Sequence, residues 1–310
     1  MHNSLLIPNI GTLRRTKGLS GQTAIISKPK MTQSPLIKKA SGEKEPFSPE
    51  KLQESLKRAG ADKKTTERIS DQISNWLYDG ASTKKIYRRA FNLLHRQHTS
   101  MAARYKLKQA IMELGPTGYP FEQYIGQLLK HSGFETQVGQ IIEGHCVRHE
   151  VDVIATSDSK QIFVECKFFN ARGKFANVKV PLYIRSRVDD IIKKRQSLPE
   201  YAGHSFQGWI VTNTRFTSDA IDFGNCTGLR LIGWDYPAGN GLKEMIEREN
   251  FFPVTALTTI SNAQKKILLD SGIVICRQIC QNPEALNKLD LSMDKLNGLR
   301  EEVDGLCGCS

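Results

Sequence analysis

The chain has 310 residues, which is room for two or three domains, and 39% hydrophobic with 25% charged residues is ordinary for a folded, soluble protein. No apolar run approaches the roughly 18 residues of a membrane span, which excludes an integral membrane protein. The formal net charge is +12, and this excess favours polyanionic partners, nucleic acid first.

The positive charge is concentrated near the start of the chain. Residues 1–34 hold five basic residues and no acidic residue, and residues 35–115 carry a net charge of +8. Residues 201–310 carry a net charge of −3. The basic character therefore belongs mainly to the first third of the sequence.

Residues 1–34 show no periodic apolar pattern, so we expect a flexible leader. Their basic composition without acidic residues is typical of a transit peptide. The favoured alternative is that Met31 is the true start of the protein. The sequence leaves both interpretations open.

Residues 35–115 are predicted to form a small α+β domain. A short strand at 36–39 runs into a turn at Ser41-Gly42, and Ser48 fits a helix N-cap with Pro49 in the first helical position. The helical segments expected after that first helix lie around 69–77, from Ser82 or Thr83 to 94, and at 102–114. Gly115-Pro116 marks the boundary that follows.

Residues 116–250 are predicted to form an α/β domain with a sheet between helices. The alternating segments 149–155 and 161–168, separated by a polar turn, form a hairpin. The apolar runs 208–212 and 229–233 are typical of strands that are buried on both faces. The expected helices lie at 121–129, 188–195 and 219–223.

Residues 251–310 are predicted to form a small helical domain. Its short helices are expected at 262–269, 273–279, 283–289 and 293–303. The fold class expected for the whole chain is therefore a multidomain α/β protein.

The seven cysteines are odd in number, irregularly spaced and without a CxxC pair. This pattern indicates reduced thiols and a cytoplasmic protein rather than a disulfide framework. A zinc site built from Cys276 and Cys280, or from Cys307 and Cys309, is the less favoured alternative, because structural zinc sites usually show two spaced ligand pairs.

The expected hairpin carries the pattern that points to chemistry. Side chains alternate between the faces of a strand, so Glu165 and Lys167 share one face and Cys166 takes the other. Asp152 lies on the preceding strand and can come alongside them. Two carboxylates about 4 Å apart repel by roughly 4 kcal/mol at an effective dielectric of 20.

A divalent cation would balance this repulsion, and Mg²⁺ prefers hard oxygen ligands of this kind. Such an ion lowers the pKa of a bound water and stabilises charge on a phosphoryl oxygen. Lys167 can then orient or deprotonate that water. The structural alternative is a solvated strand pair with a cross-strand ion pair between Asp152 and Lys167.

These residues resemble the Mrr-type branch of the PD-(D/E)XK restriction endonucleases. The motifs that carry the resemblance are Gly118-Tyr119-Pro120-Phe121-Glu122, Gly133-Phe134, EVDVIA at 150–155 and FVECK at 163–167. The resemblance implies a mixed sheet flanked by helices and Mg²⁺- or Mn²⁺-dependent hydrolysis of DNA phosphodiesters. It assigns Asp152, Glu165 and Lys167 to catalysis, and Asp152, Glu165 and Glu122 to the metal. Val151 replaces the family's usual proline.

Residues 35–112 resemble the ATP-cone, a nucleotide-sensing module. The resemblance rests on Leu36-Ile37-Lys38-Lys39, Gly42, Glu45-Pro46-Phe47, Lys51, Tyr87 and Ala103-Arg104-Tyr105. It implies a short hairpin over a helical bundle that binds ATP or dATP, with Lys38, Lys39 and Lys51 on the phosphates. The turn Lys39-Ala40-Ser41-Gly42 is one residue longer than the family's Arg-Asp-Gly. A basic helical domain that binds only DNA is the alternative.

Two further segments could contact DNA. Residues 254–280 resemble a helix-hairpin-helix unit, although the turn Ser261-Asn262-Ala263 lacks the glycines of that motif, and protein–protein packing or oligomerisation is the alternative. Residues 172–195 are rich in Arg and Lys with Phe175 and Tyr183 interleaved, and suit either a DNA backbone contact or a solvated face.

The sequence thus predicts a cytoplasmic, Mg²⁺-dependent deoxyribonuclease of the type II or type IV restriction class, or a repair enzyme. ATP or dATP would act as an effector, because no GxxxxGK[ST] phosphate loop is present. DNA is the expected partner, and the oligomeric alternatives are a homodimer or a higher homo-oligomer. The competing hypothesis is a non-enzymatic, nucleotide-sensing regulator that binds DNA through an inactive nuclease fold.

Overall fold

The computed structural model of the protein describes residues 34–39, 41–171 and 173–309. The predicted leader therefore lies outside the described residues, apart from Ser34. Residues 35–310 form one unit by their internal contacts. Among the helices described, none has the length and apolar character that crossing a bilayer would require.

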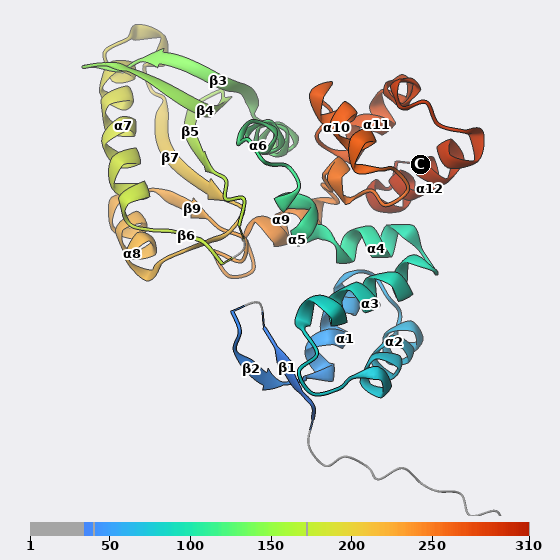
Figure 1. The fold of residues 1–310 in the computed structure, drawn as a ribbon. Coiled ribbons are helices and arrows are strands. Elements are labelled where there is room, and N and C mark those ends of the chain that lie inside the picture. Colours follow the sequence, from blue (N-terminus) through green and yellow to red (C-terminus); the bar gives the residue numbers. More distant parts are fainter. Residues whose placement is uncertain (1–33, 40, 172, 310) are drawn as a thin grey trace, which may run out of the picture. The chain divides into compact units, whose positions relative to one another are not determined.

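The first part of this unit is a two-stranded hairpin beside a set of helices (Figure 1). The strands β1 (Leu36–Lys38) and β2 (Lys44–Pro46) pair antiparallel. The helices are α1 (Pro49–Arg58), α2 (Lys63–Trp76) and α3 (Thr83–His95). Ser48 and Ser82 cap α1 and α3 as predicted, because each hydroxyl accepts a backbone N–H bond from the first turn.

The helix predicted over 102–114 is in fact two helices, α4 (Thr99–Tyr105) and α5 (Leu107–Met112). The chain bends at Lys106, whose nearly buried ammonium donates to Glu113 Oε2 at 2.9 Å and to the carbonyl oxygen of Thr255 at 3.1 Å. The amphipathic pattern of the sequence could not reveal this bend, because Lys106 is held there by Thr255, which is 149 residues away.

A five-stranded mixed sheet forms the centre of the next part. Its strands are β3 (Glu135–Glu143), β4 (Arg148–Ser157), β5 (Lys160–Lys167), β7 (Ser205–Thr212) and β9 (Arg230–Ile232), in the order β3-β4-β5-β7-β9. The pairs β3·β4 and β4·β5 are antiparallel, whereas β5·β7 and β7·β9 are parallel. The predicted hairpin and both predicted buried strands are present, and the expected α/β fold class is confirmed.

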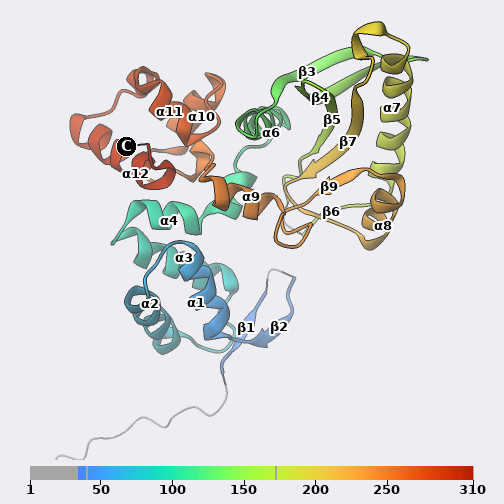
Figure 2. The ribbon, with the colours of Figure 1, turned by 180° about the vertical axis from the view of Figure 1, so that it is seen from behind.

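Helices cover both faces of this sheet (Figures 1 and 2). On one face α6 (Tyr119–His131) packs with the C-terminal helices against Val153, Val164 and Val211. On the other face α7 (Lys179–Gln196) and α8 (Ser218–Thr227) pack against Ile154, Phe163 and Ile210. The short strands β6 (Phe175–Ala176) and β8 (Arg215–Phe216) pair parallel beside them. The sheet is therefore shielded on both sides, as its continuous apolar runs indicated.

The C-terminal part is helical and shares its apolar core with α6 and the sheet. Its elements are α9 (Leu242–Glu249), a 3₁₀ turn (Val254–Ala256), α10 (Asn262–Asp270), α11 (Cys276–Gln281), a 3₁₀ helix (Pro283–Leu289) and α12 (Met293–Cys307). The turn that the helix-hairpin-helix resemblance placed at Ser261-Asn262-Ala263 is instead the start of α10, which Ser261 caps, and only the 3₁₀ turn precedes it. Residues 254–260 contribute to the apolar core instead, where Leu257 and Ile260 are buried.

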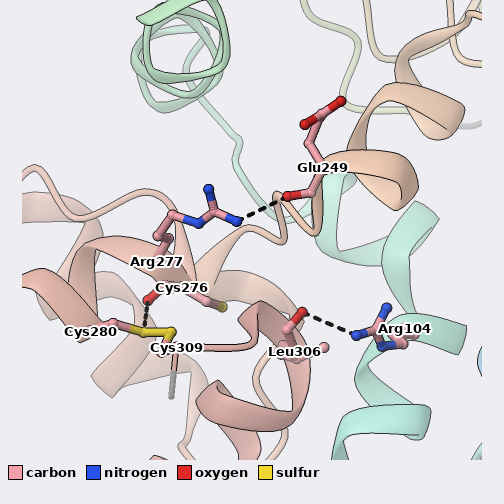
Figure 3. Close-up of a disulfide and its surroundings, with 7 residues drawn as sticks. All are labelled: Arg104, Glu249, Cys276, Arg277, Cys280, Leu306 and Cys309. Carbon is pink, nitrogen blue, oxygen red and sulfur yellow. Dashed lines mark hydrogen bonds between the residues drawn. A yellow bond between two sulfur atoms is a disulfide. The ribbon is translucent and has the colours of Figure 1, made fainter. Parts of the chain in front are cut away.

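The expectation of seven reduced thiols is also wrong for one pair, since Cys280 and Cys309 form a disulfide (Figure 3). Their sequence separation is 29 residues, and the Cα atoms lie 6.2 Å apart. The other cysteines are free, namely Cys146, Cys166, Cys226, Cys276 and Cys307. The pairing depends on how α11 and α12 pack, which spacing alone could not show.

Candidate active site

The β4–β5 hairpin places Asp152 where its regular ladder ends. The last paired residues are Val153 and Val164, and Asp152 and Glu165 come directly beyond them. There the Asp152 side chain enters the ladder, because Oδ2 accepts the backbone N–H of Cys166 at 2.6 Å. This bond fixes the carboxylate at the end of the two strands.

Glu165 faces α7, on the side of the sheet opposite to Cys166. Its Oε1 accepts a hydrogen bond from the Tyr183 hydroxyl at 2.8 Å, and its Oε2 pairs with Arg187 Nη1 at 3.0 Å. Arg187 also donates to the backbone carbonyl of Glu150 on β4. The helix thus holds the carboxylate of β5 through two side chains that lie one turn apart.

Glu122 approaches the same carboxylates from the first turn of α6. A Cβ on Gly118 would lie 2.9 Å from Glu122 Oε1, so the carboxylate would have to move if residue 118 were larger. The negative charges of Glu150 and Glu165 act on Glu122 and raise its pKa, although its burial is the larger cause. The three carboxylates predicted as metal ligands are therefore brought to one place.

Burial and repulsion make the ionised state of this cluster costly. The pKa of Asp152 rises to about 7, chiefly because the side chain is buried and secondly because Glu165 is close. The backbone bond from Cys166 and the charge of Arg187 lower this pKa but do not offset the rise. A cluster of partly buried oxygen donors that resist ionisation fits a hard divalent cation, which would stabilise the carboxylate form.

Lys167 ends β5 two residues beyond Glu165 and, by strand alternation, on the same face. The Thr212 hydroxyl donates to the carbonyl oxygen of Lys167 at 2.7 Å, which ties this position to β7. Within the described part of the chain, the Lys167 ammonium makes no ion pair. The half-buried amine is thus available to a water or a phosphate oxygen at the same strand end.

The predicted nucleotide ligands lie on different elements. Lys38 ends β1, Lys39 follows it, and Lys51 is exposed on the first turn of α1. Lys39 pairs with Glu45 at 2.8 Å and with Glu43 at 3.2 Å, and these bonds raise its pKa. The hairpin over helices that was expected for this part is present, but one of its three lysines already has acidic partners.

Sequence reasoning missed the roles of Tyr183 and Arg187. Both belong to the basic stretch 172–195, for which a DNA contact or a solvated face was expected, whereas both contact Glu165. Other members of that stretch are also engaged, since Arg185 pairs with Asp189 and Arg195 donates to the Tyr201 hydroxyl at 2.6 Å. Arg172 lies outside the described residues. An arginine one helical turn after a tyrosine was the available signal, but their partner is on another element.

Comparison with known proteins shows which families match this chain. Residues 115–236 match the family model described as restriction endonuclease, and residues 252–307 match the one described as AF1548-like, C-terminal. An uncharacterised protein of Archaeoglobus fulgidus is 32% identical over 186 residues, which are 59% of this chain and all of that protein. The chain belongs to the AF1548-like family.

Two solved structures extend this comparison. The crystal structure of AF1548, a protein of unknown function, aligns with 63% of this AF1548-like chain and 100% of its own, at a TM-score of 0.50 and 31% identity. The restriction endonuclease MspJI, solved with a 27-mer oligonucleotide, aligns with 56% of this chain and 36% of its own at a TM-score of 0.30 and 15% identity, too low a likeness for an argument.

The restriction endonuclease match covers the whole carboxylate cluster of this AF1548-like protein. It begins at residue 115, before Glu122 on α6, and ends at residue 236, after β9. The domain therefore contains the hairpin with Asp152 and Glu165 and the helix α7 that binds Glu165.

Proposed function

We propose that this chain is a metal-dependent DNA endonuclease that hydrolyses phosphodiester bonds. The observation that carries the proposal is the convergence of Asp152, Glu165 and Glu122 at one strand end, inside a restriction endonuclease domain. The elevated pKa of Asp152 supports it, because strongly shifted carboxylates gather at functional sites.

The proposed roles follow from position. Asp152, Glu165 and Glu122 would hold Mg²⁺ or Mn²⁺, and the bound ion supplies an acidified water and charge stabilisation at the phosphoryl oxygen. Lys167 Nζ would hold the attacking water in line and accept its proton or stabilise the charge that develops. Arg187 and Tyr183 keep the Glu165 carboxylate in place through its two oxygens. The same proposal includes the class of the enzyme, which is a type II or type IV restriction endonuclease or a repair endonuclease.

The test is cleavage of supercoiled plasmid DNA with Mg²⁺ or Mn²⁺ by the full chain, by Asp152→Ala and by Lys167→Ala. Lys167→Ala removes the proposed general base, and loss of such a group typically costs about 10²- to 10⁴-fold in rate. Asp152→Ala removes a proposed metal ligand, so both variants should be nearly inactive. Asp158→Ala is the matched control, because Asp158 is exposed in the turn at the other end of the same hairpin. Its activity should equal that of the wild type.

Equal cleavage by all four proteins would refute the assignment of the site. Binding of DNA by gel shift, without any metal-dependent cutting by the wild type, would instead support the rival hypothesis of a regulator with an inactive nuclease fold. A homodimer would allow both strands to be cut, and light scattering of the full chain with and without duplex DNA measures that state.

We also propose that residues 35–115 bind ATP or dATP and so regulate the nuclease. The observation in favour is the β1–β2 hairpin beside a helical bundle, with exposed Lys38 and Lys51 at the end of the strand and the start of the helix. Flexible ammonium groups suit a polyphosphate. Both matched families begin after residue 114, so this proposal rests on the sequence resemblance and this geometry.

Calorimetry of the full chain with ATP and with dATP tests nucleotide binding. Lys38→Ala and Lys51→Ala should each weaken binding, whereas Lys63→Ala, a fully exposed lysine at the start of α2, should leave it unchanged. Absence of binding heat with either nucleotide in the wild type, at several temperatures, would remove the sensor. Plasmid cleavage with and without ATP then gives the sign of the control.

A further inference from the structure

The four cysteines nearest the end of the sequence come together from two helices. Cys276 and Cys280 lie on α11, one helical turn apart. Cys307 ends α12, and Cys309 follows after Gly308, whose positive φ of 63° turns the chain back. The structure joins these two pairs, which were separate candidates in the sequence.

Contacts between cysteines link α11 to the end of α12. Cys280 is bonded to Cys309 (Figure 3). The thiols of Cys276 and Cys307 lie close enough to act on each other's pKa, and the Cys276 thiol also donates to the Pro253 carbonyl oxygen at 3.5 Å. Each contact between cysteines therefore links one cysteine of α11 with one cysteine from the end of α12. Cys276 and Cys307 are both buried, so these thiols are shielded from bulk solvent.

Charged groups surround Cys307, whereas burial raises the pKa of the neighbouring Cys276 thiol. Arg277 and Arg104 are the cations that act on Cys307, while Asp304 is the opposing carboxylate. Arg104 also donates to the carbonyl oxygens of Gly305 and Leu306 at 3.1 Å each, and Arg277 donates to the Glu249 carbonyl oxygen at 3.2 Å (Figure 3). Both guanidinium groups are thus fixed beside the end of α12.

We propose that Cys276, Cys280, Cys307 and Cys309 form, in their reduced state, a structural binding site for Zn²⁺. The arrangement Cys-x₃-Cys on one helix and Cys-x-Cys after another supplies the two spaced ligand pairs that four-coordinate zinc sites use. The Cys280–Cys309 disulfide is the oxidised, metal-free form of this site. In a reducing compartment, clustered cysteines more often bind metal than form lasting disulfides.

Reduction followed by metal binding converts the disulfide form into the zinc form. A dithiol reductant transfers two electrons and two protons to the Cys280–Cys309 bond, which breaks to give two thiols while the reductant becomes a disulfide. Zn²⁺ then replaces the four thiol protons, which are released. The tetrathiolate complex carries a net charge of −2, which Arg104 and Arg277 partly offset. The metal would then cross-link α11 to the end of α12 in place of the disulfide.

Asp304 offers a competing ligand set. One of its carboxylate oxygens and the sulfurs of Cys280 and Cys309 all lie within 4.8 Å of one another. Thiolate is the softer donor and binds zinc without a carboxylate in Cys₄ sites. In the reduced state the sulfurs of Cys276 and Cys307 must move toward the other pair, and Asp304 then stays outside the ligand set.

The experiment measures metal content of the full chain, reduced with a phosphine, incubated with Zn²⁺ alone and freed of excess ion by gel filtration. One zinc per chain is expected by elemental analysis, and Co²⁺ in its place should give the absorption of a tetrahedral thiolate site. The double variant Cys280→Ser/Cys309→Ser should lose the metal. Cys146→Ser/Cys226→Ser, which alters two exposed cysteines elsewhere, should keep it.

Three outcomes would overturn the proposal. They are a reduced wild-type chain that binds neither Zn²⁺ nor Co²⁺, a variant with all four cysteines changed that still binds, and loss of zinc in Asp304→Asn with retention in Cys276→Ser. If a variant misfolds, the wild type still decides the question, because mild oxidation must release the zinc in step with formation of the Cys280–Cys309 disulfide, detected by peptide mapping.

Discussion

Arg187 on α7 binds Glu165 on β5, with Nη1 3.0 Å from Oε2. The carboxylate is 15% exposed and the guanidinium 27%, so solvent weakens this ion pair only in part. The same arginine donates to the carbonyl of Glu150 and thereby links β4, β5 and α7 at the proposed catalytic end of the sheet. It brings a positive charge to a cluster of carboxylates that otherwise repel one another.

Arg187→Ala should therefore destabilise the metal-free protein. Breaking a buried pair costs about 3–5 kcal/mol, and partial exposure of this pair reduces our expectation to about 1–3 kcal/mol. Denaturant unfolding in a chelator measures the loss. Arg58→Ala is the control, because Arg58 forms an exposed ion pair with Glu54 one turn away on α1. Equal losses in the two variants would contradict a special role for Arg187. The deficit should shrink in Mg²⁺, which restores positive charge at Glu165.

The pKa of Asp152 predicts an unusual dependence of stability on pH. Since the folded-state pKa of about 7 lies above the ordinary value near 4, the folded protein binds this proton more tightly than the unfolded chain. Metal-free protein should therefore gain stability as the pH falls from about 8 to about 5. The gain attributable to Asp152 is the difference from Asp152→Asn, which cannot titrate at this position.

Unfolding free energies of both proteins at these two pH values, in a chelator, give the measurement. The change in unfolding free energy between the two pH values should differ by a few kcal/mol between the two proteins. Saturating Mg²⁺ should remove this difference, because the ion favours the carboxylate. Parallel pH profiles of wild type and Asp152→Asn in the chelator would show that Asp152 has an ordinary pKa.

The hairpin with Asp152 and Glu165 could be predicted from the sequence, because both strands alternate and a polar turn separates them. The common face of Glu165 and Lys167 also follows from alternation alone. The edge strand β3 escaped notice, since one residue in two along it is exposed and polar side chains mask the period. The start of α7 was missed for a similar reason, because its basic residues interrupt the apolar stripe of Val180, Ile184 and Val188.

Contacts between elements could not be predicted in this way. Glu165 and Arg187 are 22 residues apart, and their meeting depends on where α7 crosses the sheet. The Cys280–Cys309 bond likewise depends on the packing of α11 against α12. Residue types and spacing identify the chemistry of such groups, whereas the partner of each group is a property of the assembled layers.

Gly118→Ala tests how Glu122 reaches the carboxylate cluster. The backbone of Gly118 has a φ of −71°, which alanine adopts without strain, so any effect arises from the added methyl group. That group would lie 2.9 Å from Glu122 Oε1 and displace the side chain. We expect cleavage to fall by about 10–100-fold at limiting Mg²⁺, as for other groups that orient metal ligands.

Gly298→Ala on α12 is the control, because its added Cβ meets only Thr259 at an ordinary 3.9 Å. Raising the Mg²⁺ concentration should restore much of the activity of Gly118→Ala if Glu122 serves the metal. A variant whose activity is unchanged at every Mg²⁺ concentration would exclude Glu122 from the metal site.

Gly144→Ala tests the loop that joins β3 to β4. Asp190 from α7 organises this loop, because its carboxylate accepts the backbone N–H of Cys146 at 2.9 Å and pairs with His149 Nε2 at 2.8 Å. A Cβ on Gly144 would collide with Asp190 Oδ2 and lie 2.5 Å from the carbonyl oxygen of Val147. We expect destabilisation of about 1–3 kcal/mol, the usual cost of overpacking.

A double-mutant cycle separates the two collisions. If the carboxylate is the main obstacle, Asp190→Ala should make Gly144→Ala less costly, so that the double variant melts at a higher temperature than the sum of the single effects predicts. Additive changes in melting temperature would assign the cost to the Val147 carbonyl instead. In the first case the loop is shaped by a side chain of α7, so the same helix fixes both Glu165 and the far end of the β3–β4 hairpin.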